Sequence, residues 1–384
     1  MNSESKSKTI TPATHDHYRV LGLMSGTSMD GLDCGLFNIT LTDPDDLRWE
    51  CLDFKTIPYN EKVRENIRAA LDGDHVRWKV ADLLLGQVFA VYSKEFLKNR
   101  VIDLIGCHGQ TIAHEDGVLS IQAGNPRFLA EELNVPVIYD FRSADIIAGG
   151  NGAPLMPFLD WLLFKNAQDN LLTLNLGGIA NITVIPKEGD RGKIIGFDTG
   201  PGMALIDECA RLYFRQICDR NGDISSAGNI NPELLDALMQ HPFVQKNPPK
   251  STGRHEFSSE MVRSLKEKYP HISNENLLRT LVLFTAKSIS YNVGKYVNFD
   301  ISKSKLIVSG GGVFHPGLMN DLRQYVNTDQ IITSIEVGID PNMKESLLMA
   351  VLAVARIKKI HSNMPKVTGA SESVCLGKIH KGNR

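Results

Sequence analysis

One carboxylate near the middle of the chain, Asp198, is well placed for acid–base chemistry. It stands in the run FDTGPG (residues 197–202), directly after an apolar, β-rich segment. Glycine lacks a Cβ atom, so its backbone can turn sharply or approach a ligand closely at the end of a buried strand. A helix predicted from Met203 onward would add a phosphate-binding N-terminus. We therefore predict that Asp198 is a general base beside a bound phosphate; the alternative is that it only caps the following turn.

Three further glycine-bearing turns follow predicted strands. The first, SGTSMDGLD (residues 25–33), has the composition of a phosphate loop but lacks the spacing and the lysine of a Walker A motif. The second contains Gly177 and Gly178, and the third, Gly310 to Gly312, would let an adenosine approach the backbone. A plain hairpin is the alternative for the first turn. Because all the clusters lie at strand ends, where open α/β sheets bind ligands, they favour ATP binding by a phosphotransferase.

The nucleotide-binding residues predicted in the first turn are Gly26, Thr27, Ser28, Met29, Asp30, Gly31, Leu32 and Asp33. Those predicted in the other two turns are Gly177, Gly178, Gly310, Gly311 and Gly312.

Polar residues after two other predicted strands could bind a sugar. His108 and Gln110 follow one apolar run, and Arg142 with Asp145 follows the next strand. Histidine and glutamine can hydrogen-bond sugar hydroxyls, but a lone histidine is often structural, and Arg142 with Asp145 could be a surface salt bridge. Glu345 begins the last predicted helix, where a carboxylate also suits the helix dipole.

The loop PPKSTGR (residues 248–254) carries two cations, Lys250 and Arg254. It could cover phosphates or be a solvated connection, and its composition does not decide between them.

The elements that must position these residues occur twice in the same order. Strand, glycine turn, strand and strand begin at Tyr18, and the pattern restarts at Leu171. Helices with apolar residues at i, i+3 and i+4 follow, and the last, residues 344–360, is predicted to pack across the domain interface. We predict two α/β domains of similar topology. The predicted parts are a disordered tail (1–17), domain I (18–165 with 345–384) and domain II (166–344).

Length and composition agree with two domains. A chain of 384 residues exceeds a single core, and 42% hydrophobic with 22% charged residues is typical of a globular protein. The net charge of −2 argues against nucleic-acid binding. No apolar run reaches the roughly 18 residues of a membrane span, and the polar start does not resemble a secretory signal. Six cysteines without metal-ligand spacing indicate buried thiols in a reducing cytoplasm.

The candidate residues stand in longer motifs, which are, in chain order, GLMSGTSMDGLD, CHGQT, DFRSADIIAGGNGAPLMP, NLGGIANIT, FDTGPG, PPKSTGR, SGGG and VTGAS. In this order they resemble the anhydro-N-acetylmuramic acid kinases, a family in the superfamily of sugar kinases, heat-shock chaperones and actin. The resemblance extends from about Val20 to Gly377. It implies a two-domain, actin-like ATPase fold (ribonuclease H-like) with an interdomain cleft that closes on substrates, and it suggests a homodimer.

The resemblance also implies a reaction. The family cleaves the 1,6-anhydro ring of anhydro-N-acetylmuramic acid with water and phosphorylates O6, using ATP and Mg²⁺. The product is N-acetylmuramic acid 6-phosphate, in the recycling of cell-wall murein.

Position by position, the resemblance makes Asp198 the general base and places Glu345 facing the substrate or its metal. Asp198 and Glu345 are therefore the candidate metal ligands. Residues 26–33 would hold the ATP phosphates, and residues 310–312 would border the adenosine. The residues that would line the sugar pocket are His108, Gln110 and Arg142.

The sequence also departs from the family pattern. Met203, His255 and His315 stand where the family usually has Asn, Glu and Asn. None of these changes removes the predicted base, so they predict altered binding, above all of the sugar. A levoglucosan kinase is the closest alternative, although the VTGAS motif at Val367 favours the muramic acid enzyme. A non-catalytic sugar- or nucleotide-binding member of the superfamily is the alternative from another class.

Overall fold

A computed structural model describes residues 16–26, 29–42, 45–71, 73–253 and 256–382. Most of the predicted tail lies outside these residues, as do Thr27, Ser28, Arg254 and His255. Among the helices in the described ranges, none is both long and apolar enough to cross a membrane.

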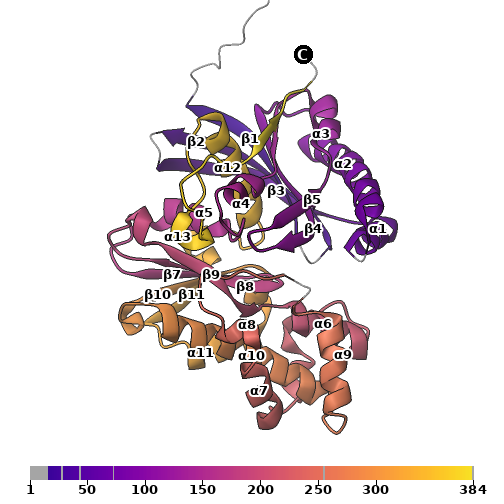
Figure 1. The fold of residues 1–384 in the computed structure, drawn as a ribbon, viewed down its shortest axis with the longest axis vertical. Coiled ribbons are helices and arrows are strands. Elements are labelled where there is room, and N and C mark those ends of the chain that lie inside the picture. Colours follow the sequence, from indigo (N-terminus) through magenta and orange to yellow (C-terminus); the bar gives the residue numbers. More distant parts are fainter. Residues whose placement is uncertain (1–15, 27–28, 43–44, 72, 254–255, 383–384) are drawn as a thin grey trace, which may run out of the picture.

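The first of two sheets forms the upper part of the molecule in Figure 1. Its strands are β1 (His17–Ser25), β2 (Gly31–Thr42), β3 (Asp46–Pro58), β4 (Leu104–Glu115), β5 (Leu119–Ala123), β6 (Val137–Tyr139) and β12 (Lys378–His380). β1, β2 and β3 pair antiparallel, whereas β1, β4 and β6 run parallel. β12, from the end of the chain, pairs antiparallel with β6, and β5 pairs with β4.

The second sheet repeats this order in the lower part. Its strands are β7 (Leu171–Leu176), β8 (Ile179–Ile185), β9 (Ile195–Pro201), β10 (Lys305–Ser309) and β11 (Gln330–Thr333). β7, β8 and β9 pair antiparallel, and β10 runs parallel to both β7 and β11. The repeated strand order and the α/β class that the sequence predicts are confirmed.

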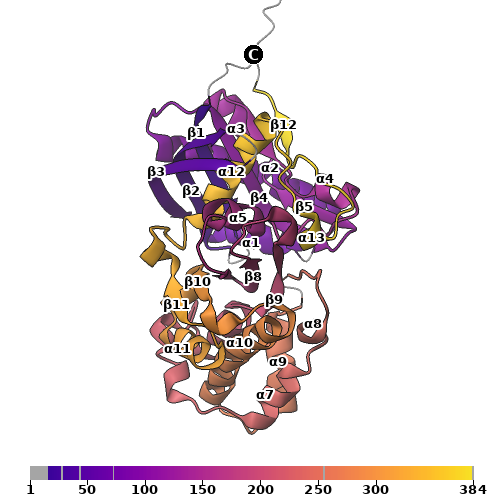
Figure 2. The same cartoon turned by 90° about the vertical axis from the view of Figure 1, so that its left-hand side faces the viewer.

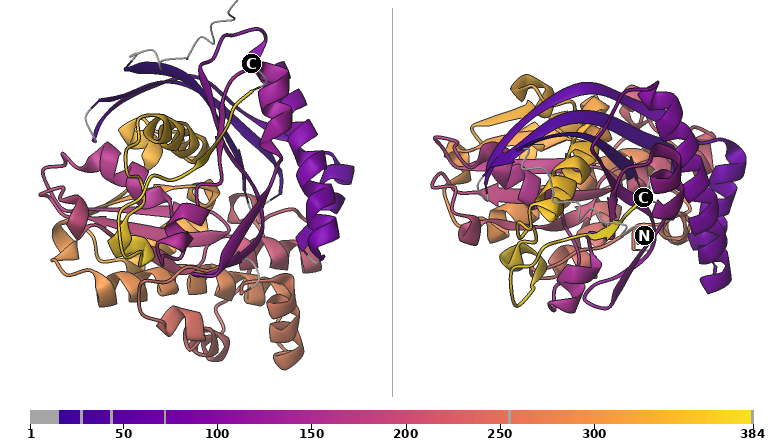
Figure 3. Two further views of the ribbon diagram at one scale, coloured as in Figure 1. Left: turned by 45° about the horizontal axis from the view of Figure 1, so that its top comes forward. Right: turned by 90° about the horizontal axis from the view of Figure 1, so that it is seen from above.

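Helices cover both faces of each sheet. In the upper lobe they are α1 (Glu61–Leu71), α2 (His75–Leu97), α3 (Pro126–Leu133), α4 (Ser143–Ile147), α5 (Met156–Phe164), α12 (Lys344–Ile357) and α13 (Pro365–Thr368). In the lower lobe they are α6 (Ala204–Phe214), α7 (Pro232–Met239), α8 (Pro242–Gln245), α9 (Ser259–Lys268), α10 (Asn274–Tyr296) and α11 (Pro316–Tyr325). Figure 3 shows α12 inside the curve of β1 to β3, with α1 and α2 on the opposite face. Helix α5 contacts both β3 and β8, so it lies between the sheets.

Figure 2 shows the two lobes one above the other. We propose that they are separate domains, made of residues 18–165 with 345–384 and of residues 166–344. The proposal is supported by the return of the chain to the first sheet through α12 and β12.

Two strands run further than the sequence predicts, and both carry candidate site residues. The sequence places a strand end at Cys107, but β4 continues to Glu115 because residues 110–115 pair with β5. Likewise, β9 continues past Asp198 to Pro201 because it remains paired with β8. These residues therefore lie within strands instead of on free strand ends.

The ends of the fold also differ slightly from the prediction. The first strand begins at His17, one residue before the predicted start at Tyr18, and Asp16 forms an ion pair with Lys358 (2.7 Å). The last long helix ends at Ile357, and it packs on the first sheet, against β1, β2 and β4.

Three glycines form a row across the first sheet, and α12 lies on it. Gly22 of β1 pairs with Gly35 of β2 on one side and Gly106 of β4 on the other. A Cβ atom on Gly22 or Gly106 would collide with backbone carbonyl groups of α12. The row therefore lets the helix rest directly on the strands, which sets the position of Glu345 in its first turn.

We expect Gly22→Ala to lower the free energy of unfolding by about 2 kcal/mol or more, because α12 must move to make room. Gly294→Ala is the matched control, since Gly294 is exposed in α10 and its Cβ would meet nothing within 4 Å. This control should gain about 0.5–1 kcal/mol from helix propensity. Denaturant unfolding measures both variants, and unchanged stability in Gly22→Ala would contradict the packing argument.

Candidate active site

Asp198 lies in β9 beside an irregularity of the strand. Asn181 of β8 pairs with Asp198, but the next pair is Ala180 with Gly200, so Thr199 is an extra residue. Such a bulge bends the strand and re-aims its side chains, and bulges are frequent beside active sites. The Asp198 side chain is buried, with 6% of the residue exposed.

The two central glycine turns are bound together through their backbones. The Gly177 carbonyl accepts a hydrogen bond from the N–H of Met203 (2.8 Å). The Gly178 carbonyl accepts from the N–H groups of Gly202 (2.9 Å) and Ala204 (3.1 Å). A Cβ atom on Gly202 would collide with the Gly177 carbonyl, so this contact requires glycine. The turn between β7 and β8 is thus held against the start of α6.

The loop between α8 and α9 contacts Asp198. The Thr252 N–H donates to the Asp198 carboxylate (2.8 Å), and the Asp198 N–H donates to the Lys250 carbonyl (3.2 Å). The Thr252 hydroxyl is buried and has no hydrogen-bond partner in the described part of the chain. This loop holds Asp198, and the proximity of its threonine to Asp198 is a feature that the sequence does not reveal.

Lys250 points into the protein interior. Its Nζ donates to Asn292 Oδ1 (2.7 Å) and to the carbonyls of Phe243 (3.1 Å) and Val244 (3.3 Å). Burial lowers its pKa to about 8, although the charge of Asp198 acts in the other direction. Lys250 therefore anchors the loop, and the structure does not place it to cover phosphates.

The environment of Asp198 favours its protonated form. Burial is the main cause and raises its pKa to about 7. The hydrogen bond from Thr252 lowers the pKa, the charge of Asp116 raises it, and the cations Arg142 and Lys250 lower it. A carboxyl group with a pKa near neutrality is suited to accept a proton during a reaction.

Arg142 is a partly buried cation whose charge acts on both candidate carboxylates, Asp198 and Glu345. Its guanidinium donates to the Gly152 carbonyl (2.8 Å) and to Nε2 of His108 (3.0 and 3.2 Å). Burial lowers its pKa to about 10, against the charges of both carboxylates, so it stays charged at neutral pH.

His108 positions Arg142 and keeps a neutral ring. Its Nδ1 donates to the Gly109 carbonyl (2.9 Å), which leaves Nε2 as the acceptor for Arg142. Burial, followed by the charge of Arg142, lowers the pKa of His108 to about 3. Both ring nitrogens are engaged within the protein, so a sugar hydroxyl could bind one only by replacing an existing hydrogen bond.

Gln110 supports the start of the first glycine turn. Its Oε1 accepts from the Ser25 hydroxyl (2.6 Å), which accepts from the Tyr59 hydroxyl (2.7 Å). All three side chains are buried. Gln110 thus fixes the end of β1, a role that local sequence does not distinguish from sugar binding.

The first glycine turn joins β1 to β2. Met29 has a positive φ of 56°, and its N–H donates to the Gly26 carbonyl (3.2 Å). The Leu32 side chain is buried in the core, so only its backbone could face a nucleotide. Thr27 and Ser28 lie outside the described residues.

The third glycine turn follows β10. Gly310 has a φ of 83° and packs against the backbone of Leu176. Gly311 is exposed, and an added Cβ would meet nothing within 4 Å. Its backbone is therefore open to the approach of a flat ring.

Glu345 lies in the first turn of α12 and reaches the second sheet. Asn175 Nδ2 donates to its carboxylate (3.3 Å). Burial raises the pKa of Glu345, while Asn175 and Arg142 lower it and Asp30 raises it. The residue is therefore coupled to both lobes.

The neighbouring Lys344 forms a buried ion pair with Asp160 of α5 (2.5 Å), and each side chain is 2% exposed. Asp160 also accepts from the hydroxyls of Thr173 (2.6 Å) and Thr183 (2.7 Å), in β7 and β8. Breaking a buried pair leaves an uncompensated charge, so this cluster holds the start of α12 against the second sheet.

Carboxylates gather near the first glycine turn. Burial raises the pKa of Asp33 to about 7; the hydrogen bond from Thr56 (2.5 Å) lowers it, and Glu345 and Asp30 raise it. Within the described ranges, no group of three or more His, Cys, Asp or Glu side chains is arranged to hold a metal ion. A cation here would need phosphate oxygens as additional ligands.

Comparison with known proteins identifies the family. The family model described as anhydro-N-acetylmuramic acid kinase matches residues 18–382. The chain belongs to this family. Proteins of Bacillus cereus and Bacillus anthracis described by the same words are each 36% identical to it over 376 residues, which covers 94% of this chain and 98% of the relative.

Solved structures show a more distant likeness. The activator of 2-hydroxyisocaproyl-CoA dehydratase from Clostridium difficile, with bound ADPNP, is 12% identical, with a TM-score of 0.44 over 88% of this chain and 96% of the other. A glucokinase from Streptomyces griseus is 11% identical, with a TM-score of 0.34 over 88% and 99%. The repeated α/β sheets and the family membership agree on a two-domain, actin-like fold.

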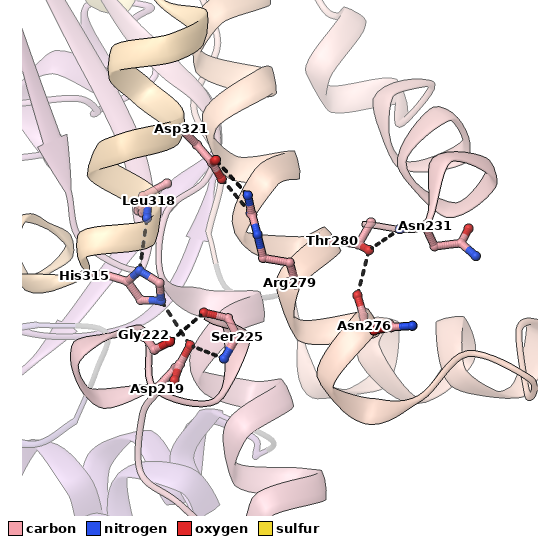
Figure 4. A network of polar contacts seen from close by, with 10 residues as sticks. All are labelled: Asp219, Gly222, Ser225, Asn231, Asn276, Arg279, Thr280, His315, Leu318 and Asp321. Carbon is pink, nitrogen blue, oxygen red and sulfur yellow. Dashed lines mark hydrogen bonds and ion pairs between the residues drawn. The ribbon is translucent and has the colours of Figure 1, made fainter. Parts of the chain in front are cut away.

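Two of the departures from the family pattern have a clear structural setting. His315 caps α11, because its Nδ1 accepts from the Leu318 N–H (3.1 Å), and its Nε2 donates to buried Asp219 (3.1 Å; Figure 4). Both ring nitrogens are thus engaged within the lobe, so His315 does not offer one to a nucleotide. Met203 precedes α6 without a side-chain cap, and its sulfur lies near Gly312. His255 lies outside the described residues.

We expect His108→Leu to lower kcat/KM for the sugar about 10- to 100-fold, because the partly buried Arg142 guanidinium loses an acceptor. His108→Gln is the matched variant, since its amide oxygen can replace Nε2, and it should stay within about tenfold of wild type. Steady-state kinetics measures both variants, and equal losses would show that His108 does not act through Arg142.

Proposed function

We propose that the chain is an ATP-dependent kinase that opens 1,6-anhydro-N-acetylmuramic acid with water and phosphorylates O6, giving N-acetylmuramic acid 6-phosphate. Membership of the anhydro-N-acetylmuramic acid kinase family supports this activity. Within the site, the observation that supports it best is Asp198, a buried carboxylate with a pKa of about 7 that interacts with the Arg142 cation.

In this proposal Asp198 takes the proton from the water that attacks C1, while the C1–O6 bond breaks through a transition state with oxocarbenium character. The Thr252 N–H orients the carboxylate, and the buried Thr252 hydroxyl is available to the water or the sugar. O6 stays bonded to C6 of the sugar and attacks the γ-phosphoryl group of ATP, and ADP leaves. That group captures the charge developing on O6, so a general acid opposite Asp198 is less necessary.

The backbone of the three glycine turns would position the nucleotide. Residues 26–33 and the turn at Gly177 and Gly178 would face the phosphates, and residues 310–312 the adenosine. Arg142, supported by His108, would bind the sugar, and Gln110 would act through Ser25.

Mg²⁺ would supply charge stabilisation for phosphoryl transfer when bound. We propose Glu345 as its protein ligand, with Asp198 as the other candidate. The fit is supported by the mutual repulsion of Glu345, Asp30 and Asp33, which a cation would relieve. Mg²⁺ commonly uses one or two carboxylates together with substrate phosphates, so no larger protein cage is needed.

We also propose a cytoplasmic location, where ATP is available, and a homodimer. The homodimer is supported by the family resemblance and by an exposed apolar stripe on α2, formed by Val76, Val80 and Leu83.

An ADP-release assay over a panel of anhydro-sugars tests the substrate. We expect kcat/KM for anhydro-N-acetylmuramic acid to exceed that for levoglucosan by about tenfold or more, because binding groups on the substrate contribute to discrimination. In ¹⁸O-labelled water, label should enter C1 and not the transferred phosphate. A preference for levoglucosan would overturn the substrate, and label in the phosphate would indicate plain ATP hydrolysis.

The pH profile tests the base. We expect kcat/KM to fall about tenfold per pH unit below about 7, because protonated Asp198 cannot accept a proton. Asp198→Asn should keep ATP binding and lower kcat by about 10³-fold or more. Glu233→Gln, an exposed acid on α7, is the control and should match wild type. A wild-type profile that stays flat to about pH 5 would contradict the assignment.

A further inference from the structure

The two lobes touch at the tip of a hairpin. Figure 1 shows β4 and β5 extending from the upper sheet toward the lower lobe. Asp116 lies in the turn between these strands, and it contacts Ser251 in the loop between α8 and α9. The two residues are 135 positions apart in the sequence, so the contact exists only because the lobes meet here.

Asp116 accepts hydrogen bonds from the opposite lobe. The Ser251 hydroxyl donates to Oδ1, and the Ser251 N–H donates to Oδ2 (3.4 Å). Lys246 Nζ of the same lobe lies 3.8 Å from Oδ2, and His114 Nε2 of the hairpin lies 3.3 Å from Oδ1. Burial acts to raise the pKa of Asp116, but the hydrogen bonds from His114 and Ser251 outweigh it and lower the pKa, so the side chain is an anion at neutral pH.

The residues on either side of Ser251 hold the predicted base. Thr252 donates its N–H to the Asp198 carboxylate (2.8 Å), and Lys250 accepts from the Asp198 N–H (3.2 Å). The Lys250 side chain is anchored inside the lower lobe by Asn292 (2.7 Å). Of these three consecutive residues, Lys250 anchors the loop in the lower lobe, Ser251 contacts the upper lobe, and Thr252 donates a hydrogen bond to the predicted base.

The contact lies where water can reach it. The Asp116 side chain is 25% exposed, and a cavity of about 450 Å³ lies beside it. The cavity is lined from one lobe by His114, Glu115 and Asp116, and from the other by Phe243, Lys246, Ser251 and Thr252. When the lobes separate, these polar groups become hydrated instead of remaining buried and unpaired, so the contact can open at little energetic expense.

We propose that Asp116 and Ser251 form an interdomain clasp that closes over the sugar site and, through Thr252, orients Asp198. The inference rests on the proposed function, because the orientation of Asp198 matters only if it is the base. Asp116 is a positioning residue that acts through the loop. The clasp opens for sugar entry and product release and closes for the chemical steps, as lids and hinged domains do in other enzymes.

A double-mutant cycle tests the clasp. We expect Asp116→Ala and Ser251→Ala each to lower kcat about tenfold, with little change in KM for ATP, because the base is less often in position. The double variant should also lose about tenfold, since either change removes the same contact. Asp116→Asn keeps an acceptor oxygen for Ser251 and should recover part of the loss. Glu115→Gln changes the exposed neighbouring carboxylate and serves as the matched control with wild-type kcat.

If the double variant loses about a hundredfold, the two residues act independently and the clasp is wrong. Small-angle scattering of the whole chain gives a second measurement that needs no activity. Asp116→Ala should have a larger radius of gyration than wild type, and equal radii would overturn the clasp. Failure of wild type to phosphorylate any anhydro-sugar would contradict the proposed function, whereas the scattering result would still decide whether the clasp holds the lobes together.

Discussion

The position of α12 against the first sheet is the constraint on which the site depends. Gly22, Gly35 and Gly106 lie side by side in neighbouring strands, and at Gly22 and Gly106 the backbone of the helix lies directly on the strand. The first turn of this helix carries Glu345 to the second sheet, where Asn175 binds it. The helix packs on the upper sheet, and its first turn contacts the lower sheet. It therefore fixes the position of the two sheets relative to each other at this point.

A raised pKa is common to three carboxyl groups of the site. Asp198, Asp33 and Glu345 have raised pKa values chiefly because they are buried. Such a carboxyl group keeps its proton in the native state at a pH where the unfolded chain has lost it. Its contribution to stability therefore declines as pH rises from the ordinary value of 3.8 toward 7 for Asp198 and Asp33. These carboxyl groups thus accept protons more readily than ordinary ones, and their burial lowers the free energy of unfolding at neutral pH.

The fold class and the candidate base both leave local signals in the sequence, and the fold class is confirmed by the two repeated sheets. Repeated apolar strands with glycine turns indicate the two sheets, and Asp198 stands alone among small residues in FDTGPG. Other features depend on partners distant in the chain. The bulge at Thr199 arises from pairing with β8, and the hydrogen bonds of His108 and Gln110 are directed to Arg142 and Ser25, which no local pattern reveals.

Two of the polar clusters that join the lobes differ in what their separation would expose. Asp160, paired with Lys344 and 2% exposed, accepts from Thr173 and Thr183 of the lower lobe, so separating the lobes here would leave buried polar groups unpaired. Asp116, at 25% exposure, would instead pass into water when it leaves Ser251. Relative motion of the lobes is therefore easiest when it pivots near the start of α12 and opens at the β4–β5 hairpin. In the proposed closure, Asp198 is held by the loop on the opening side, whereas Glu345 lies beside the pivot.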